Sequence, residues 1–132
     1  MPSSGYISAL RALPDGKLLV SGITFYRINA DGSRDATFNP GSSGFNSGSA
    51  VLDIELTPDN KILIGGSFNS YNGISRSKIA LLLSDGTLDT TFEPAANFAY
   101  VNDLAIQPNG KIIVAGKTAI TPRPPYLSES LA

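Results

Sequence analysis

The chain has 132 residues, of which 42% are hydrophobic and 16% are charged, so it can form one folded domain. Its net charge of −1, without long runs of either sign, argues against partners such as nucleic acid or an anionic membrane surface. It contains no Cys and no His, which excludes disulfides, thiolate zinc sites and His-dependent catalysis.

The chain opens with a short polar lead-in at 1–5, which lacks the features of a signal peptide. Three later segments share one pattern. They are residues 7–22, 51–66 and 101–116, whose equivalent lysines, Lys17, Lys61 and Lys111, lie 44 and 50 residues apart. Self-similarity at this interval is typical of repeat architectures. No apolar run is long enough to span a membrane, so membrane insertion is not expected.

Each of the three segments predicts a β-hairpin. Its first half alternates apolar and polar residues, as in LDIELT at 52–57, which indicates a strand with one buried face. A Pro-Asp-Gly, Pro-Asp-Asn or Pro-Asn-Gly turn follows, whose last residue can adopt a positive φ. The second half, such as KILIGG at 61–66, is apolar on both faces, so we expect cover on both sides. It ends at a Gly (Gly22, Gly66 or Gly116), where we expect a bulge or a close backbone approach.

The third strand is expected at 24–29 in the first repeat and at 78–83 in the second. The second repeat carries additional residues at 69–78, which are polar and contain Gly, so we expect a surface loop there. Both third strands lead to a second signature, ADGSRDATFNP at 30–40 and SDGTLDTTFEP at 84–94. Its Asp-Gly pair predicts a turn, and the remainder predicts a fourth strand or an edge stub.

These features divide the chain into six parts. They are the lead-in at 1–5, a first repeat at 6–40, a Gly/Ser linker at 41–50, a second repeat at 51–94, a truncated third repeat at 95–116 and a Pro-rich C-terminal tail at 117–132. We expect the tail not to pair as a central strand, because its prolines have no backbone donor.

Short strands in repeats of this length, without helical periodicity, predict an all-β fold: a partial β-propeller of two and a half to three four-stranded blades. The motifs PDGKLLVSG and INADGSRDATF, with LLSDGTLDTTF in the second repeat, also resemble the delta-60 repeat family of bacterial propeller-like proteins. The resemblance covers about residues 7–116. It implies a propeller of repeated blades, commonly in secreted, surface or phage-associated proteins, and it implies no catalytic residue.

A ring needs roughly four to eight blades, which is more than this chain has. We therefore expect either a fragment or a ring completed by oligomerisation, as a homodimer, a homotrimer or a larger protein assembly. If the Asp-x-Thr-Phe strand closed the following blade, the blades would span 7–29, 34–83 and 88–116, and two chains head to tail would give six. Leu19 and Ile113, on the second strands of the terminal blades, would then be covered by a partner chain.

Asp31 with Asp35, and Asp85 with Asp89, repeat the spacing Asp-Gly-x-x-Asp. These four are candidate metal-ligating residues, because Ca²⁺ takes carboxylate oxygens as ligands. We favour turn capping instead, since the pattern lacks the further ligands of an EF-hand loop. No cofactor is indicated.

An enzyme is not expected. Asp53 and Asp103 occupy equivalent positions and Glu55 lies close to Asp53, so a glycosidase or lyase that acts on a polysaccharide is conceivable from paired carboxylates. Residues at repeat-equivalent positions usually serve the repeat, however. An enzyme should break the repeat symmetry with one singular acidic cluster, and the sequence contains none.

The predicted function is a non-catalytic structural or interaction module that assembles with copies of itself, in an extracellular or virion assembly. Aromatic residues and one arginine in or near loops are the candidate partner-binding residues: Tyr71, Arg76, Phe98, Tyr100 and Tyr126. Aromatic side chains also stack on sugars, so a carbohydrate-binding adhesin is the alternative. Local packing at the blade rims would explain the same residues without a partner.

Overall fold

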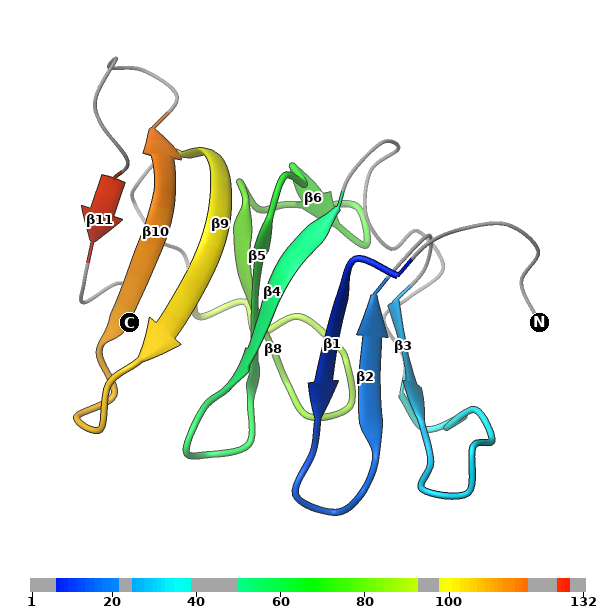
Figure 1. Ribbon diagram of the computed structural model, residues 1–132. Helices are drawn as coiled ribbons and strands as arrows, with labels where there is room; N and C mark the ends of the chain where they lie inside the picture. The colour runs from blue at the N-terminus through cyan, green and yellow to red at the C-terminus, as the bar shows by residue number, and fades with distance from the viewer. Residues whose placement is uncertain (1–6, 22–24, 39–49, 93–97, 119–125, 129–132) are drawn as a thin grey trace.

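The computed structural model describes residues 7–21, 25–38, 50–92, 98–118 and 126–128, and the statements below concern these residues. Three antiparallel sheets stand side by side in chain order, like neighbouring blades of a propeller (Figure 1). The described residues form strands, turns and bends and no helix, and so no helix that could cross a membrane. The prediction of an all-β, partial β-propeller is confirmed.

The strand bounds follow the repeat. The first blade consists of β1 (Ala9–Ala12), β2 (Leu18–Ser21) and β3 (Phe25–Ile28). The second consists of β4 (Val51–Leu56), β5 (Ile62–Gly66) and β8 (Ile79–Leu82), with a hairpin of β6 (Ser70–Tyr71) and β7 (Ile74–Ser75) between β5 and β8. The third consists of β9 (Phe98–Ile106), β10 (Ile112–Thr118) and β11 (Tyr126–Ser128). In each blade the second strand lies in the centre of the sheet.

The central strand of the middle blade is covered on both faces, as predicted. All five residues of β5 are buried. Ile62 and Ile64 belong to an apolar cluster shared with the first blade, and Leu63 belongs to a second cluster shared with the third blade. Alternation of side chains along β5 therefore places one residue set in each of the two interfaces between blades.

The turns adopt the predicted conformations. Gly16, Asn60 and Gly110 end the three hairpin turns with φ of 90°, 67° and 86°. Gly32 and Gly86 in the second signature have φ of 91° and 94°. Gly, and to a lesser degree Asn, tolerates this left-handed region, which explains why these residue types recur there.

The glycines that end the second strands allow a close backbone approach. A Cβ on Gly66 would lie 2.1 Å from the carbonyl oxygen of Ala50, and one on Gly116 would lie 2.3 Å from that of Tyr100. The pairing of β9 with β10 shifts register next to Gly116. The predicted bulge or close approach is confirmed at these two positions, and Gly22 lies outside the described residues.

The additional residues of the second repeat form a hairpin rather than the expected surface loop. Asn72 and Gly73 connect β6 to β7 with φ of 50° and 81°, which is the Asn-Gly hairpin turn that the sequence analysis overlooked. Tyr71 is fully buried, and its hydroxyl donates to the carbonyl of Gly86 at 2.5 Å. Tyr71 therefore anchors the insertion to its own blade, while residues 72–75 are exposed, as expected of a surface segment.

The second signature closes its own blade, so the supposition that it closes the following blade is wrong. Arg34 pairs with Ile28 of β3, and Leu88 pairs with Leu82 of β8, each as a single antiparallel bridge. One bridge makes an edge stub rather than a full fourth strand. Phe38, which follows the stub in the first repeat, packs in the cluster between the first and second blades.

Part of the expected tail also belongs to the sheet. β11 pairs antiparallel with β10, with Val114 opposite Ser128. Its prolines precede β11 in the sequence, so the strand keeps its backbone donors. The third blade therefore has three strands, although β11 carries none of the repeat pattern that identified the other third strands.

Candidate functional site

The strands β1, β4 and β9 each form one edge of a blade, and we call them the inner strands. β4 contacts both β1 and β9, and the three run side by side at the front of Figure 1. Asp53 and Glu55 belong to β4 and Asp103 belongs to β9, and their carboxylate oxygens lie within 4.8 Å of one another. Arg11 of β1 joins this group, with its Nη2 2.8 Å from Oε2 of Glu55.

These side chains connect each inner strand to the next. Asp53 accepts the N–H of Ile54 in its own strand at 2.9 Å and the N–H of Leu104 in β9 at 2.8 Å, with one carboxylate oxygen each. Asp103 accepts the N–H of Leu104 at 2.9 Å. Arg11 connects the first two blades, because its Nε donates to the carbonyl of Ile54 at 2.7 Å.

Burial and the neighbouring Asp103 carboxyl raise the pKa of Asp53 to about 7. Both causes disfavour the ionised carboxylate, since burial removes water and a hydrogen bond with the Asp103 carboxyl favours the protonated form, and the nearby charge of Glu55 acts in the same direction. The hydrogen bond from the N–H of Leu104 acts in the opposite direction and is outweighed. Asp53 therefore holds a proton in mildly acidic solution, while it still bridges two blades.

The cluster has two conceivable chemical uses. Three carboxylates at this distance could ligate a hard cation, although Arg11 already pairs with Glu55. Carboxyl groups about 5 Å apart also match the spacing in retaining glycosidases. A glycosidase needs a cleft that holds its substrate beside the two carboxyl groups, and the pocket described next does not contain them. The observed hydrogen bonds assign the cluster to the junctions between blades.

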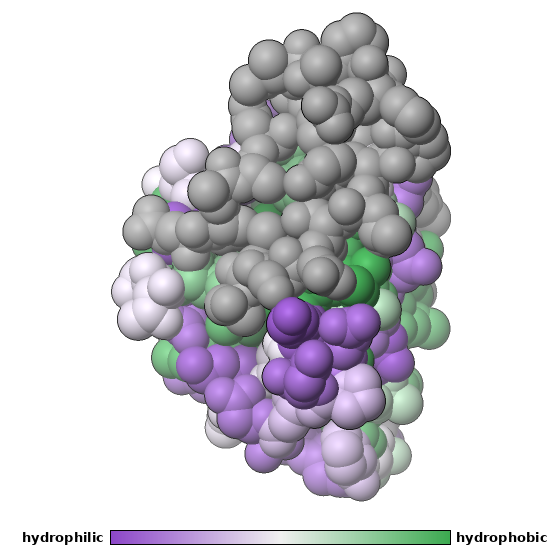
Figure 2. Space-filling view, turned by 90° about the vertical axis from the view of Figure 1, so that its left-hand side faces the viewer, coloured by the Kyte–Doolittle hydropathy of each residue, from purple (hydrophilic) through white to green (hydrophobic). Residues whose placement is uncertain are grey.

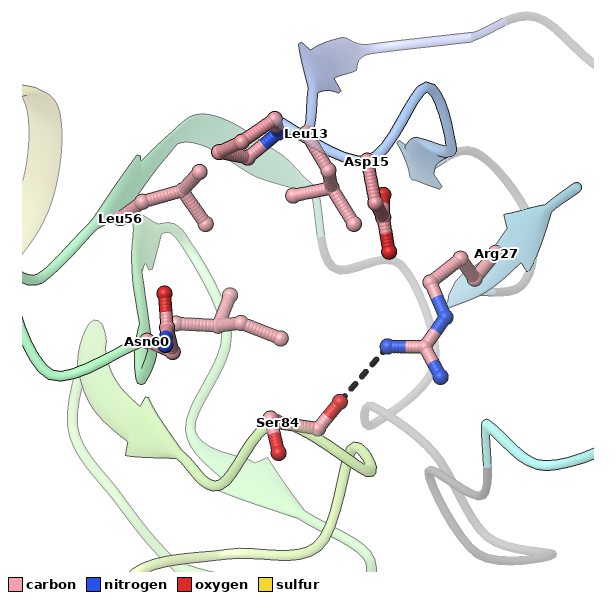
Figure 3. A pocket seen from close by; sticks show the side chains of 8 residues that line it. Leu13, Asp15, Arg27, Leu56, Asn60 and Ser84 are labelled. Atoms are coloured by element: carbon pink, nitrogen blue, oxygen red, sulfur yellow. Dashed lines mark hydrogen bonds between the residues drawn. The ribbon is translucent and has the colours of Figure 1, made fainter. Parts of the chain in front are cut away.

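A pocket of about 360 Å³ lies between the first and second blades (Figure 3). Its lining consists of Leu13, Pro14, Asp15, Arg27, Leu56, Asn60, Ile62 and Ser84. Arg27 donates from Nη1 to the carbonyl of Ser84 at 2.7 Å and from Nε to Oδ2 of Asp35 at 2.8 Å. Its guanidinium also lies 4.8 Å from the ring centroid of Phe38. Arg27, which the sequence analysis did not single out, therefore connects two blades.

The four aspartates of the repeated Asp-Gly-x-x-Asp spacing are engaged within their own repeats. Asp31 accepts the backbone N–H of Ser33 at 2.9 Å, and Asp85 accepts that of Thr87 at 3.0 Å. The hydroxyl groups of the same two residues donate to these carboxylates, which lowers the pKa of both aspartates. This is the turn capping that we favoured over a calcium loop.

The second aspartate of each spacing forms an ion pair. Asp35 lies 2.8 Å from Nζ of Lys17, and Asp89 lies 2.7 Å from Nζ of Lys61. The lysine and the threonine two residues later, Thr37 or Thr91, lower the pKa of Asp35 well below its usual range and that of Asp89 to about 2. A cation at either position would compete with a lysine that already compensates the charge.

Several predicted partner-binding residues lie in the core. Leu19, Tyr71 and Phe98 are fully buried, and Arg76 is also buried. Leu19 and Tyr71 pack in the cluster between the first two blades, and Phe98 packs in the cluster between the second and third. The prediction that a partner chain covers Leu19 is therefore wrong, and Tyr71 and Phe98 are not loop residues that a partner could reach.

Two of the predicted residues remain accessible. Tyr100 is exposed, and Ile113 is half-buried in β10. Ile113 pairs with Ala105, on the face of the third blade that points away from the second. Tyr126 belongs to β11, and its side chain lies outside the described residues.

Comparison with protein families identifies two matching segments, residues 13–38 and 57–92. Both match the model of a family described as a domain of unknown function (DUF5122) beta-propeller. Each segment runs from the residue before a hairpin turn to the phenylalanine of the second signature in its repeat, Phe38 or Phe92. The searches of curated proteins and of solved structures found no match. With three antiparallel blades side by side, the family match supports a β-propeller repeat family for this chain.

Proposed function

We propose that the chain is a non-catalytic interaction module whose terminal blades bind copies of itself and thereby complete a β-propeller ring. The supporting observation is a difference between equivalent positions. Leu10 in the first blade is 58% exposed, whereas its equivalents Ile54 and Leu104 are 1% and 4% exposed. Leu18 is 37% exposed, against 2% and 3% at the equivalent positions in β5 and β10. At Leu10 and Leu18 the first blade therefore exposes apolar side chains whose equivalents the other two blades bury, whereas Val20 on the same face of β2 is 2% exposed.

The opposite end of the chain presents the matching face. Ile113 is equivalent to Leu19 and Leu63, both of which are fully buried against the next blade. Figure 2 shows the molecule from this side, with hydrophilic residues gathered in its lower half. Within the chain, the face that carries Leu19 or Leu63 packs twice against the face of the next blade that carries the equivalent of Leu10: Leu19 shares a cluster with Ile54, and Leu63 with Leu104. A third such contact, between chains, would cover both remaining faces.

The number of blades favours a dimer. Three blades per chain give six in a head-to-tail pair, which lies within the usual range of about four to eight blades. The contact joins two different faces of the chain, so it is heterologous. A closed ring of two chains contains two identical junctions of this kind. We propose that the repeats are of the delta-60 type, on the motifs of the sequence analysis, and that the ring serves an extracellular or virion assembly.

Sedimentation velocity over a range of protein concentrations tests this proposal. The wild-type chain should shift from monomer to dimer as its concentration rises, because association buries the two terminal faces. Leu10→Asp should stay monomeric at every concentration, since it places a charge in the junction. Leu83→Asn is the matched control, because Leu83 is also an exposed leucine and Asn29 is its equivalent in the first repeat. A wild-type chain that is monomeric at all concentrations contradicts the proposal.

The two alternatives have less support. An adhesin would need accessible aromatic side chains, but of the three described aromatics that we singled out, Tyr71 and Phe98 are buried and Tyr100 is exposed. An enzyme would need its carboxylates free for substrate, but Asp53 and Asp103 bind backbone N–H groups and Glu55 pairs with Arg11. We propose a non-catalytic role for this reason.

A further inference from the structure

The backbone N–H of Leu10 points away from its own sheet. The N–H of Leu13 donates to the carbonyl of Lys17 at 2.8 Å, which sets the hydrogen-bonding pattern of the β1–β2 hairpin. Hydrogen-bonded and non-hydrogen-bonded pairs alternate along an antiparallel hairpin. Counting back from Leu13 opposite Lys17, Leu10 and Val20 form a pair without hydrogen bonds to each other. Because β1 is an edge strand, the N–H of Leu10 faces outward from the sheet.

In the other two blades, a carboxylate accepts the equivalent N–H. The acceptor is the preceding residue, Asp53 in β4 and Asp103 in β9. Asp53 also reaches the next blade, where its second oxygen accepts the N–H of Leu104. The residue that precedes Leu10 is Ala9, which has no acceptor in its side chain. The first blade therefore lacks the carboxylate that its own strand would supply.

We propose that Asp103 of one chain accepts the N–H of Leu10 in a second copy of the chain. This inference rests on the proposed head-to-tail ring and assigns the polar contact at its junction. Asp103 is exposed and makes the bond to its own strand. Asp53 also accepts an N–H from the next blade, that of Leu104, whereas among the described residues no N–H of another blade donates to Asp103. The Leu10 N–H of a copy supplies that donor.

The second copy is favoured as the occupant because the junction then repeats one that already exists in the chain. Between the second and third blades, Asp53 and Leu63 face Leu104 and Ile112. At the new junction, Asp103 and Ile113 take the places of Asp53 and Leu63. Leu10 and Leu18 of the copy take the places of Leu104 and Ile112. Acceptor, donor and apolar side chains thus occupy equivalent positions in both junctions.

Sedimentation equilibrium of Asp103→Ala and wild type tests this contact. Each dimer contains the contact twice, so loss of a hydrogen bond worth about a factor of ten at each junction should weaken self-association about a hundredfold. Asp103→Asn keeps an acceptor oxygen and should lie between the two. Asp85→Ala is the control, since Asp85 is an exposed aspartate whose hydrogen bonds stay in its own turn, and it should associate like wild type.

The hydrogen-exchange rate of the Leu10 amide tests the contact directly. If Asp103 only stabilised its own strand, its replacement would not change how dimerisation affects this rate. In wild type this amide should exchange more slowly at concentrations above the dissociation constant than below it, and in Asp103→Ala the difference should shrink. If Asp103→Ala dimerises as tightly as wild type, or if the Leu10 amide exchanges equally fast in the dimer, the inference is wrong and the ring stands. If the wild-type chain never associates, the ring and this contact both fall.

Discussion

Lys61 and Asp89, which belong to different signatures of the second repeat, form an ion pair with 2.7 Å between Nζ and Oδ2. Lys17 and Asp35 form the same pair in the first repeat at 2.8 Å. Each pair joins the residue before the central strand to the edge stub of the same blade. This explains why the two signatures occur together, since each supplies one partner of the pair.

The Lys61–Asp89 pair predicts a loss of stability in acid. Lys61 and Thr91 lower the pKa of Asp89 to about 2, from an ordinary value of 3.8. A carboxylate with a lowered pKa stabilises the fold above its unfolded pKa, and this contribution disappears as pH falls through the folded pKa. Urea unfolding at pH 4 and pH 2 should therefore show a smaller loss for Asp89→Asn than for wild type, from a lower starting stability at pH 7.

Asp15→Asn is the control for that comparison. Asp15 is exposed, and an Asn there still accepts the N–H of Lys17. It should lose stability in acid as wild type does. Equal acid losses in wild type and Asp89→Asn would show that the ion pair does not govern this part of the pH dependence.

The central strands of the three blades should respond differently to truncation. Leu63→Ala should cost about 2–5 kcal/mol of unfolding free energy, because it leaves a cavity between the second and third blades. Leu19→Ala should cost a similar amount, since Leu19 is buried within the chain. Ile113→Ala should instead weaken association, with an effect on the melting temperature that grows with protein concentration. Thermal unfolding at two concentrations separates these outcomes. A concentration-independent loss in Ile113→Ala would place its cover within one chain.

Local patterns in the sequence were sufficient to predict the strands and turns. Alternation, Pro-Asp-Gly turns and terminal glycines depend on neighbours within a few residues, and the structure reproduces them at Gly66 and Gly116. The Asn72-Gly73 turn carried an equally local signal. The polar composition around it favours a loop more strongly, and this is why the composition places Tyr71 in a loop although its side chain is buried.

Contacts between blades could not be predicted in the same way. Asp53 and Asp103 were recognised as equivalent carboxylates, but their separation depends on how the second blade packs on the third. The direction in which Arg27 reaches Ser84 depends in the same way on how the first blade packs on the second. β11 escaped detection because its three residues carry no repeat pattern. Periodicity thus identifies an element, whereas its partners follow from packing that periodicity does not encode.

Gly65 should be required for the close approach of the second and third blades. A Cβ on Gly65 would lie 2.7 Å from Cγ1 of Val101 and 3.0 Å from Cδ1 of Leu104. Gly65→Ala should therefore cost about 1–3 kcal/mol, as overpacking of an interior does. Chemical denaturation measures this loss. Because Val101 is the nearer neighbour, truncating it makes room for the added methyl group. Gly65→Ala should therefore cost less stability in a Val101→Ala background than in wild type. If Gly65→Ala unfolds at the wild-type denaturant concentration, the blades have room that the structure does not show.

The Asp53 carboxyl predicts a pH dependence of the opposite sign to that of Asp89. Burial and Asp103 raise the pKa of Asp53 from 3.8 to about 7, so the folded chain binds a proton there more tightly than the unfolded chain does. The resulting stability is fully present below the unfolded pKa and is lost as pH rises through the folded pKa. The melting temperature of wild type should therefore rise as pH falls from about 7.5 to about 4.5, above the range in which Asp89 is protonated.

Asp53→Asn cannot ionise and can still accept the N–H of Leu104, so its melting temperature should change less over this interval. Asp85→Asn, which alters an aspartate outside the cluster, should follow the wild-type curve. Parallel curves for wild type and Asp53→Asn would mean that Asp53 is ionised throughout this interval, which contradicts the raised pKa.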